Sequence, residues 1–468
     1  MAAYFQFKTA ADLAAAATAL GVELPLSGDF APTFAPATVG GRAVGNRWCV
    51  HPMEGCDGNP DGSPGELTVR RYTRFGDGGA KLLWGEACAV TESARANPRQ
   101  LWLAPHTLAA FRDLVQVCRA AHRAANGDDA DLLFGLQLTH SGRYSSVPVV
   151  ACRDTILESR PGAKVPPLAT DDELARLVDD YVATAKLAAA AGFDFVDVKQ
   201  CHRYLLSELL GARTRPGKYG GSYENRTRLA RDIIRAVRAA VPGLLVATRL
   251  NVFDGVPFRK GANDVGEPDP FSAPVENGWG LNPNDPLTPD LTEPLRWVAE
   301  MAALGVAAVN VTLGNPYAQP HYGRPFEVAP PDGYRMPEHP LVGVARHFDL
   351  TAAVQRANPG LPVVGTGYSY LQEFLPHAAA GNLRAGRATF AGVGRATLSQ
   401  PDWVRQLRDH GALDRKRVCR TFSYCTAIMR ERRHPLGQFP TGCPPFDKEG
   451  YGKVWKDVQA LAVRGGGS

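Results

Sequence analysis

The chain has 468 residues, of which 44% are hydrophobic and 21% are charged, a composition typical of a globular protein rather than of a disordered one. Its 52 basic and 47 acidic residues leave a formal net charge of +5, and these charges are scattered, which argues against nucleic acid as a partner. The first residues lack the basic flank and apolar core of a signal peptide, and no segment offers about 18 consecutive apolar residues. We therefore expect a cytoplasmic protein with no membrane partner. The sequence does not decide whether it forms a homo-oligomer.

Eight short apolar runs alternate with longer helical patterns along the chain. Several runs, such as LLFGLQL and FDFVDV, are almost continuously apolar, which suits parallel strands that are covered on both faces. Amphipathic helices are predicted between them, for example over residues 172–191 and 223–241. This alternation predicts a closed α/β fold, the TIM (β/α)8 barrel, rather than an open sheet. The predicted strands are residues 47–51, 81–90, 132–138, 193–198, 244–250, 306–313, 361–366 and 388–393.

One barrel with extensions accounts for the length of the chain. We expect an N-terminal extension over residues 1–40, the barrel over residues 41–410, and a C-terminal extension over residues 411–468 that packs on the barrel. The connections after the third, fifth and sixth strands are far longer than the usual length of about 2–6 residues. All three leave strand ends where barrels keep active sites, so we interpret them as capping loops over a cleft. They cover residues 139–167, 251–290 and 314–337.

Three polar side chains directly follow the fourth predicted strand. Lys199, His202 and Tyr204 lie in the run DVKQCHRYLL, and groups of this kind at the carboxyl end of a barrel strand are positioned for proton transfer. A histidine hydrogen-bonded within the fold and a packed tyrosine are the commoner case. The presence of Lys199 beside them favours the catalytic interpretation.

Glycine-rich turns follow the seventh and eighth predicted strands. The first contains Gly365 and Gly367, and the second contains Gly394 and Arg395. Glycines let backbone N–H groups approach a phosphate closely, and barrels commonly bind phosphate with these two loops. Glycines that merely end strands are the alternative, but two adjacent loops with an arginine favour a phosphate-bearing ligand.

Six motifs together resemble the Old Yellow Enzyme family of flavin oxidoreductases. The most specific is YGGSYENRTRL at residues 219–229, which is preceded by AAAAGFDFVDVKQCHRYLLSELL. The motifs fall in the order of the family and cover about residues 40–410, a combination too specific for chance. The others are NRWCVHPMEG at residues 46–55, WGEACAV at 84–90, LQLTHSGR at 136–143, TRL at 248–250 and VGRATLSQPDW at 393–403.

The resemblance implies non-covalent FMN as the cofactor and NADPH or NADH as the reductant. It implies that Pro52 and Met53 pack against the isoalloxazine and that Ala87 lies near its reactive edge. Gln137 would hydrogen-bond the pyrimidine side of the flavin, and Arg249 would lie near N1 and O2, where a guanidinium stabilises negative charge on the reduced ring. A structural ion pair at the barrel mouth is the alternative for Arg249.

The resemblance also implies a small unsaturated molecule as substrate. Family members bind the carbonyl oxygen of an activated alkene with a His–His or His–Asn pair, and a tyrosine protonates its α-carbon. By position, His202 is the second member of the pair, Tyr204 is the proton donor, and Lys199 replaces the first member. Glu54 is a second departure, because relatives carry Thr or Cys there near O4, and an ionised carboxylate would disfavour anionic flavin. Glu54 turned toward solvent or paired with an arginine is the alternative.

Other activities stay open from the sequence. Lys199 in place of a histidine allows a flavin-dependent dehydrogenation or isomerisation on the same scaffold. From a different class, a barrel lyase or aldolase would use Lys199 to form a Schiff base while the glycine loops hold a substrate phosphate. A catalytically silent barrel that binds flavin is a third alternative.

Nine cysteines are too sparse for a disulfide scaffold, and we expect mostly buried thiols and no disulfides. Larger relatives of the family carry an iron–sulfur cluster on four closely spaced cysteines just after the barrel. Cys419, Cys425 and Cys443 lie in the corresponding region, with Phe422 where another ligand is expected. Three thiolates at these spacings do not make the compact set that a cluster requires, so we expect neither a cluster nor another metal.

Overall fold

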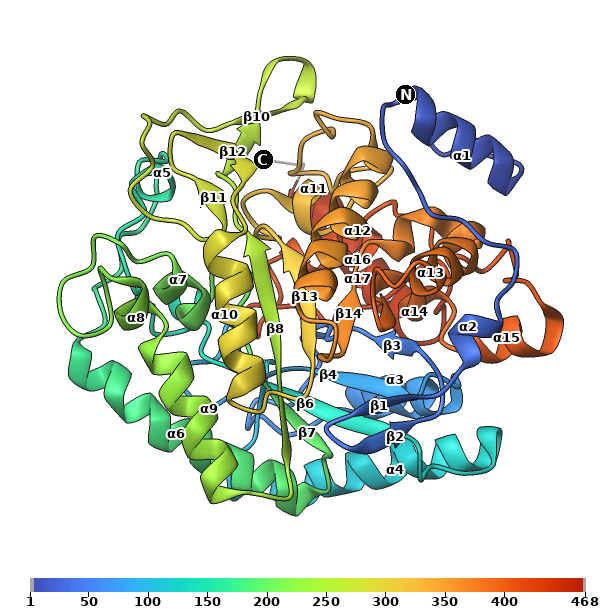
Figure 1. The fold of residues 1–468 in the computed structure, drawn as a ribbon, viewed down its shortest axis with the longest axis horizontal. Coiled ribbons are helices and arrows are strands. Elements are labelled where there is room, and N and C mark those ends of the chain that lie inside the picture. The colour runs from blue at the N-terminus through green and yellow to red at the C-terminus, as the bar shows by residue number, and fades with distance from the viewer. Residues whose placement is uncertain (1–3, 466–468) are drawn as a thin grey trace.

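Eight parallel strands close into a barrel in the computed structural model, which describes residues 4–465 (Figure 1). The strands are β3 (Trp48–Val50), β4 (Leu82–Ala89), β6 (Leu133–Thr139), β7 (Phe195–Val198), β8 (Leu245–Phe253), β13 (Val309–Leu313), β14 (Val363–Gly365) and β15 (Phe390–Val393). β15 pairs with β3, and β3 pairs with β4, so the sheet closes on itself. Each strand overlaps one of the eight predicted runs, and the predicted TIM barrel is confirmed.

Helices surround the barrel strands, as Figure 1 shows. They are α3 (Glu66–Asp77), α4 (Leu108–Asn126), α6 (Asp171–Ala191), α9 (Arg228–Ala240), α10 (Thr292–Ala303), α12 (Pro340–Ala357), α13 (Leu375–Arg384) and α15 (Trp403–His410). These helices pack on the barrel through an apolar face. In α9, for example, Leu229, Ile233 and Val237 recur at helical spacing and are all fully buried. Within residues 4–465, no helix is long and apolar enough to cross a membrane.

The signals that start and stop α6 are local. The Thr170 hydroxyl accepts a hydrogen bond from the backbone N–H of Glu173 at 3.2 Å, and the Glu173 carboxylate accepts one from the backbone N–H of Thr170 at 2.7 Å. Gly192 ends the helix in the left-handed region, with φ of 95°. The predicted helix over residues 223–241 is instead two helices, α8 (Tyr223–Arg226) and α9, which are separated at Thr227, whose hydroxyl donates to the Tyr223 carbonyl at 2.8 Å.

The two ends of the barrel are closed differently. At the amino-terminal end, the antiparallel hairpin of β1 (Ala37–Val39) and β2 (Arg42–Val44) packs Val39 and Val44 into one apolar cluster with Phe195 of β7. At the carboxyl-terminal end lie the long connections. Their elements are η1 (Gly142–Tyr144), α5 (Thr155–Glu158), α7 (Leu205–Leu210), β9 (Phe258–Lys260), η2 (Ala262–Asp264), β10 (Gly266–Pro268), β11 (Leu281–Asn282), β12 (Asp285–Pro289) and α11 (Pro320–Gly323).

Other short elements lie outside the strand-helix repeat. They are α1 (Ala10–Ala19), α2 (Ala31–Phe34), β5 (Leu101–Trp102), η3 (Tyr368–Phe374), α14 (Arg395–Ser399), α16 (Tyr424–Arg430) and α17 (Tyr451–Gly465). The segment that contains α16 and α17 contacts α3, because Asp447 forms ion pairs with Arg70 and Arg74. The domain boundaries at residues 40 and 410 stay predictions, and the β1–β2 hairpin spans the first of them.

Candidate active site

Two adjoining cavities open at the carboxyl ends of the barrel strands, one of about 620 Å³ and one of about 170 Å³. The larger cavity brings together ten of the predicted site residues, namely Pro52, Met53, Glu54, Ala87, Gln137, Lys199, His202, Tyr204, Arg249 and Arg395. The smaller cavity shares several of these and adds Gly367 and Gly394. Gly365 ends β14 and lines neither cavity, although the adjacent Thr366 lines the smaller one.

Lys199 and Tyr204 contact each other in the larger cavity. The Lys199 ammonium lies 3.5 Å from the centroid of the Tyr204 ring, and the Tyr204 hydroxyl lies 3.2 Å from the hydroxyl of Tyr317. Burial lowers the pKa of Lys199 below its usual value, although Cys201 and Glu54 oppose that shift. Burial raises the pKa of Tyr204 well above its usual value. The phenol is therefore protonated at neutral pH.

His202 has a backbone conformation that non-glycine residues rarely adopt. Its φ is 65°, that of Arg203 is 56°, and the backbone N–H of His202 donates to the Asn251 side-chain oxygen at 3.3 Å. Left-handed residues outside glycine cluster at functional sites, where the surroundings hold the strain. Burial, with the cations Arg249 and Lys199, brings the pKa of His202 well below its usual value. The imidazole is therefore neutral at pH 7.

Asp197 of β7 organises the polar floor of the site. It accepts hydrogen bonds from Trp84 Nε1 at 2.7 Å, from Gln137 Nε2 at 2.6 Å and from the backbone N–H of Arg249 at 2.7 Å. The amide of Gln137 is therefore held in one orientation. Among residues 4–465, the guanidinium of Arg249 donates only to the Pro52 carbonyl, at 3.4 Å, and its buried Nε has no hydrogen-bond partner. Within the described part of the chain, no carboxylate forms the ion pair that was the alternative for Arg249.

Glu54 lines the cavity and is held by a residue that the sequence did not single out. Its carboxylate accepts a hydrogen bond from Asn97 Nδ2 at 2.9 Å. Burial raises the pKa of Glu54, while the Lys199 cation and the Asn97 hydrogen bond act in the opposite direction. Glu54 is half-buried where it lines the cavity, and none of the ion pairs among the described side chains involves it.

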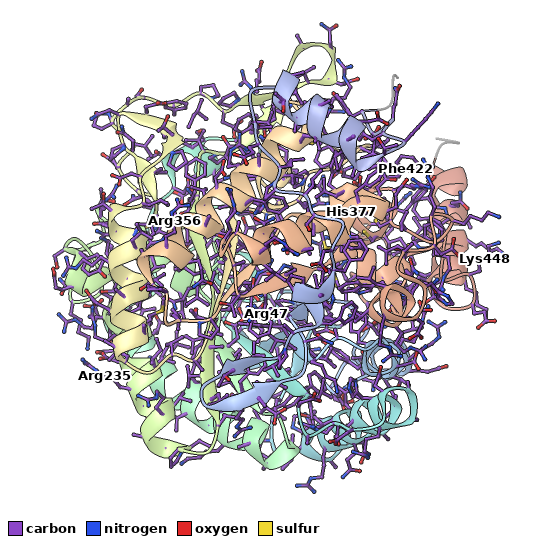
Figure 2. All side chains as sticks on the ribbon, turned by 45° about the vertical axis from the view of Figure 1, so that its right-hand side comes forward. Arg47, Arg235, Arg356, His377, Phe422 and Lys448 are labelled. Carbon is purple, nitrogen blue, oxygen red and sulfur yellow. The ribbon has the colours of Figure 1, made fainter. Side chains whose placement is uncertain are left out.

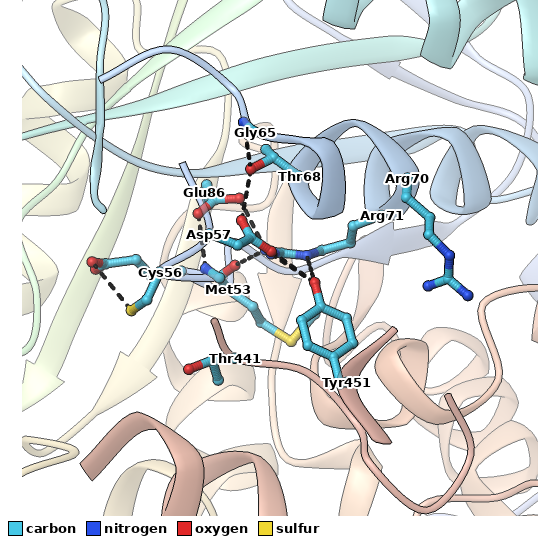
Figure 3. Close-up of polar contacts among 12 residues, drawn as sticks. Met53, Cys56, Asp57, Gly65, Thr68, Arg70, Arg71, Glu86, Thr441 and Tyr451 are labelled. Atoms are coloured by element: carbon cyan, nitrogen blue, oxygen red, sulfur yellow. Dashed lines mark hydrogen bonds and ion pairs between the residues drawn. The ribbon is translucent and has the colours of Figure 1, made fainter. Parts of the chain in front are cut away.

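A buried ionic network holds the Met53–Glu54 segment in place (Figure 3). Arg71 of α3 donates to the Met53 carbonyl at 3.2 Å and to Glu86 at 2.9 Å, and it also pairs with Asp57. Glu86, the neighbour of Ala87 on β4, accepts the backbone N–H of Gly55 at 2.8 Å. The Tyr451 hydroxyl of α17 donates to Asp57 at 2.7 Å. One end of the site is thus fixed jointly by α3, β4 and the C-terminal segment.

Several cavity residues were not predicted from the sequence. Tyr144 and Tyr317 bring their rings to 4.5 Å from each other, and Arg324 lines both cavities. Others come from the C-terminal segment, namely Cys425, Thr426, Met429, Arg432, Gln438 and Thr441. The only sequence signal for Tyr317 and Arg324 is their place in the long connection after β13.

The described residues contain no group of three or more His, Cys, Asp or Glu side chains arranged to hold a metal ion. Cys419, Cys425 and Cys443 are free thiols, as are the other six cysteines. Phe422, between the first two, is 46% exposed (Figure 2).

The sequence is similar to those of known flavin oxidoreductases. The sequence profile of the NADH:flavin oxidoreductase / NADH oxidase family matches residues 32–270. An NADPH dehydrogenase from Clostridium acetobutylicum is 27% identical over 214 residues, which are 45% of this chain and 60% of that relative.

Two solved structures share the fold. A 2-naphthoyl-CoA reductase gives a TM-score of 0.69 at 15% identity, over 91% of this chain and 58% of that one. The Old Yellow Enzyme homologue from Zymomonas mobilis gives a TM-score of 0.58 at 20% identity, over 82% of this chain and 94% of that one.

The cavity residues fit a phosphorylated flavin. Arg249 Nε and Arg395 Nη1 are buried nitrogens with no hydrogen-bond partner in the described part of the chain, and their side chains line both cavities. An unpaired buried cation is costly unless an anionic ligand offsets it, and FMN carries a phosphate and a ring that becomes anionic on reduction. Because the profile match spans just over half of the chain, the protein belongs to the NADH:flavin oxidoreductase / NADH oxidase family, whose cofactor is FMN.

Proposed function

We propose that this protein is a reductase that takes hydride from NADPH or NADH and delivers it to an electron-poor C=C bond conjugated to a carbonyl or similar group. One observation carries the proposal: an ammonium, a neutral imidazole and a protonated phenol, all from the end of β7, line one cavity with Arg249 and Gln137. This set supplies donors for a substrate oxygen and a proton for carbon.

The proposed cofactor contacts follow the cavity lining. Pro52, Met53 and Ala87 would pack against the isoalloxazine, and Glu54 would lie near O4. Gln137 would hydrogen-bond the pyrimidine side, and Arg249 would offset negative charge at N1 and O2. The phosphate would bind at Gly365, Gly367, Gly394 and Arg395.

FMN, when bound and reduced, would supply one hydride, which carries both electrons of the reduction. Lys199 and His202 would donate hydrogen bonds to the substrate oxygen on which negative charge gathers. Tyr204 would transfer its phenolic proton to the α-carbon, and Tyr317, at 3.2 Å, is placed to hydrogen-bond the phenolate left behind.

Tyr204→Phe should separate the two half-reactions. Flavin reduction by NADPH should proceed at the wild-type rate, because that step needs no proton from the phenol. Alkene reduction should slow by about 100-fold, the lower end of the range for general acid catalysis, because solvent can partly replace the donor. Stopped-flow absorbance measures each step.

Tyr317→Phe is the matched control, since it keeps the proton on Tyr204 and should slow alkene reduction far less. Equal slowing of both half-reactions in Tyr204→Phe would contradict the assignment.

Arg249→Leu should weaken FMN binding or slow its reduction by NADPH, because the charge on the reduced ring would be unmet. Fluorescence titration of apoprotein with FMN, followed by stopped-flow reduction, measures both. Arg249→Lys keeps the cation and should recover part of the loss. Wild-type affinity and reduction kinetics in Arg249→Leu would show that the guanidinium serves another purpose.

The full reaction is tested by reducing the holoenzyme with NADPH and then mixing it anaerobically with a panel of enones. Reoxidation with formation of the saturated product supports the proposal. Rapid reduction without reoxidation by any enone would favour the dehydrogenase or isomerase alternative.

The lowered pKa of Lys199 also suits a Schiff-base nucleophile. Borohydride trapping of a covalent substrate adduct on Lys199 would support that activity and overturn the reductase proposal.

A further inference from the structure

Asn251 is a buried amide near the carboxyl end of β8 that connects the ends of three neighbouring barrel strands. Its side chain is fully buried and lines neither cavity of the site. Its Oδ1 accepts a hydrogen bond at 3.3 Å from the backbone N–H of His202, which follows β7. Its Nδ2 donates at 2.8 Å to the carbonyl of Gly314, which follows β13. Asn251 can therefore influence a substrate only through the residues that it holds.

Asp254 fixes the orientation of this amide. Asn251 Nδ2 also donates to the Asp254 carboxylate at 2.8 Å, and that carboxylate accepts the backbone N–H of Trp279 at 3.1 Å. A carboxylate accepts hydrogen bonds, so the nitrogen of the amide must face it. The oxygen of the amide is therefore left facing the backbone N–H of His202.

The turn that carries His202 needs such support. His202 and Arg203 both have left-handed backbones, with φ of 65° and 56°, a conformation that persists only where the surroundings hold it. The ion pair of Arg203 with Asp154 and the bond from its backbone N–H to Ser207 Oγ, at 3.3 Å, hold the second residue of the turn. Asn251 holds the first.

The direction of the His202 imidazole depends on that backbone. The imidazole lines both cavities, and among residues 4–465 no side chain or carbonyl forms a hydrogen bond with it. Nothing but its own backbone and the packing around it therefore sets where its nitrogens point. A hydrogen-bond donor is useful only when it is directed at its acceptor, because the bond weakens steeply as the angle closes.

We propose that Asn251 is a positioning residue, which directs the His202 imidazole at the substrate oxygen by holding the left-handed backbone of its turn. This inference rests on the proposed role of His202 as a donor to that oxygen. It explains why a fully buried polar side chain, which touches neither cavity, lies across the ends of three strands that carry the site.

The test begins with Asn251→Leu, which removes both hydrogen bonds at similar volume. Misplacement of a reacting group by about 1 Å can cost about 100-fold, so we expect alkene reduction to slow by roughly 10- to 100-fold. The affinity of the holoenzyme for a para-substituted phenol, whose oxygen mimics that of an enolate, should fall as well. Stopped-flow absorbance and a spectroscopic titration of FMN-saturated protein measure the two effects.

A double-mutant cycle with His202→Ala separates positioning from general damage. If Asn251 acts through His202, then Asn251→Leu should change alkene reduction by less than about twofold once the imidazole is gone. Asn382→Leu is the matched control, because Asn382 is also buried and donates to the Ala378 carbonyl at 2.9 Å, but in α13 and outside the site. It should lower Tm without slowing alkene reduction.

Asn251→Asp should rescue the reaction. It keeps the oxygen that accepts the His202 N–H but brings a second carboxyl against Asp254, so one of the two must take up a proton. We expect Tm to fall, while alkene reduction by the folded holoenzyme stays within about threefold of the wild-type rate. Because this variant keeps the proposed contact, it decides the matter even if Asn251→Leu does not fold: a loss in Asn251→Asp of 10-fold or more would overturn the inference.

The outcomes distinguish this inference from the proposed function. Equal fold losses for Asn251→Leu with and without His202, or wild-type activity in His202→Ala, would overturn the role of Asn251 while leaving the reductase proposal in place. A wild-type protein that no enone reoxidises would overturn the proposed function itself. The phenol titration, carried through the same cycle, would then still decide whether Asn251 acts through His202.

Discussion

Arg71→Met is expected to lower the free energy of unfolding by about 3–5 kcal/mol at pH 8, the cost of removing one partner from a buried ion pair. Arg71 is 4% exposed and lies between two carboxylates, Asp57 and Glu86, which are equally buried. Methionine fills similar volume without the charge, so both carboxylates would stay buried and uncompensated. Urea unfolding of the FMN-saturated wild-type protein and variant, followed by circular dichroism, measures the two free energies of unfolding.

The loss in Arg71→Met should depend on pH. Burial raises the pKa of Glu86 to about 7 in the folded protein, against 4.5 for a free carboxyl, although Arg71 opposes the shift. The folded state therefore binds more protons than the unfolded state between these values, and the contribution of Glu86 to stability falls as the pH rises from about 4.5 to 7. Without Arg71 the folded pKa rises further. The variant should thus lose less stability at pH 5, where Glu86 is protonated, than at pH 8.

Arg70→Met provides the matched control for that measurement. Arg70 precedes Arg71 on α3 and pairs with Asp447, but its side chain is 31% exposed. Its partner Asp447 is buried but keeps a second cation, Arg74, when Arg70 is removed, so the loss in Arg70→Met should be smaller than in Arg71→Met. Comparable losses in the two variants, or a loss in Arg71→Met that does not change between pH 5 and pH 8, would show that burial of the network is not the cause.

The barrel was predictable because its strands are short, covered on both faces and therefore almost uninterrupted in apolar sequence, as LLFGLQL shows for β6. Residues that follow such strands share one end of the barrel whatever their distance along the chain. For this reason Lys199, His202 and Tyr204 could be assigned to the active-site end of the barrel from the sequence. Gln137 and Arg249 lie within β6 and β8, and only the family resemblance assigned them to the site. The break at Thr227 was missed, because the hydrophobic periodicity of residues 223–241 does not mark it.

The rest of the cavity could not be predicted because it comes from segments with no repeating pattern. Asn97, Tyr317 and Thr441 reach the site from three separate connections, and only the fold brings them together. The ionic network around Arg71 could not be predicted from the sequence either. Its members Asp57 and Tyr451 are far apart in sequence, and either alone resembles an ordinary surface residue. Glu54 shows the same limit, since the hydrogen bond that it accepts from Asn97 could not be predicted from the sequence.

Lys199→Ala should cost about 2–4 kcal/mol of transition-state stabilisation in alkene reduction, if Lys199 behaves like other donors to a developing oxyanion. Its ammonium is buried beside the proposed proton donor, 3.5 Å from the centroid of the Tyr204 ring. Reduction of the enzyme by NADPH should change little, because no substrate oxygen is present in that step. Lys218→Ala is the control, since Lys218 also lies over a tyrosine ring, that of Tyr219, but outside the cavity.

The charge of Lys199 can be tested without turnover by titrating the holoenzyme with a para-substituted phenol, which mimics an enolate. A cation beside the ligand favours its ionised form, so the wild-type protein should bind the phenolate and hold the pKa of the phenol below its value in water. Lys199→Ala should raise that pKa and weaken binding. Burial lowers the pKa of Lys199 below its usual 10.5. As the pH is raised, the ammonium should therefore lose its proton before pH 10.5 is reached, and the affinity of the wild-type protein for the phenolate should then fall. The variant, which has no ammonium to titrate, should lack that alkaline fall. An identical pH profile for the two proteins would exclude Lys199 from the oxygen-binding site.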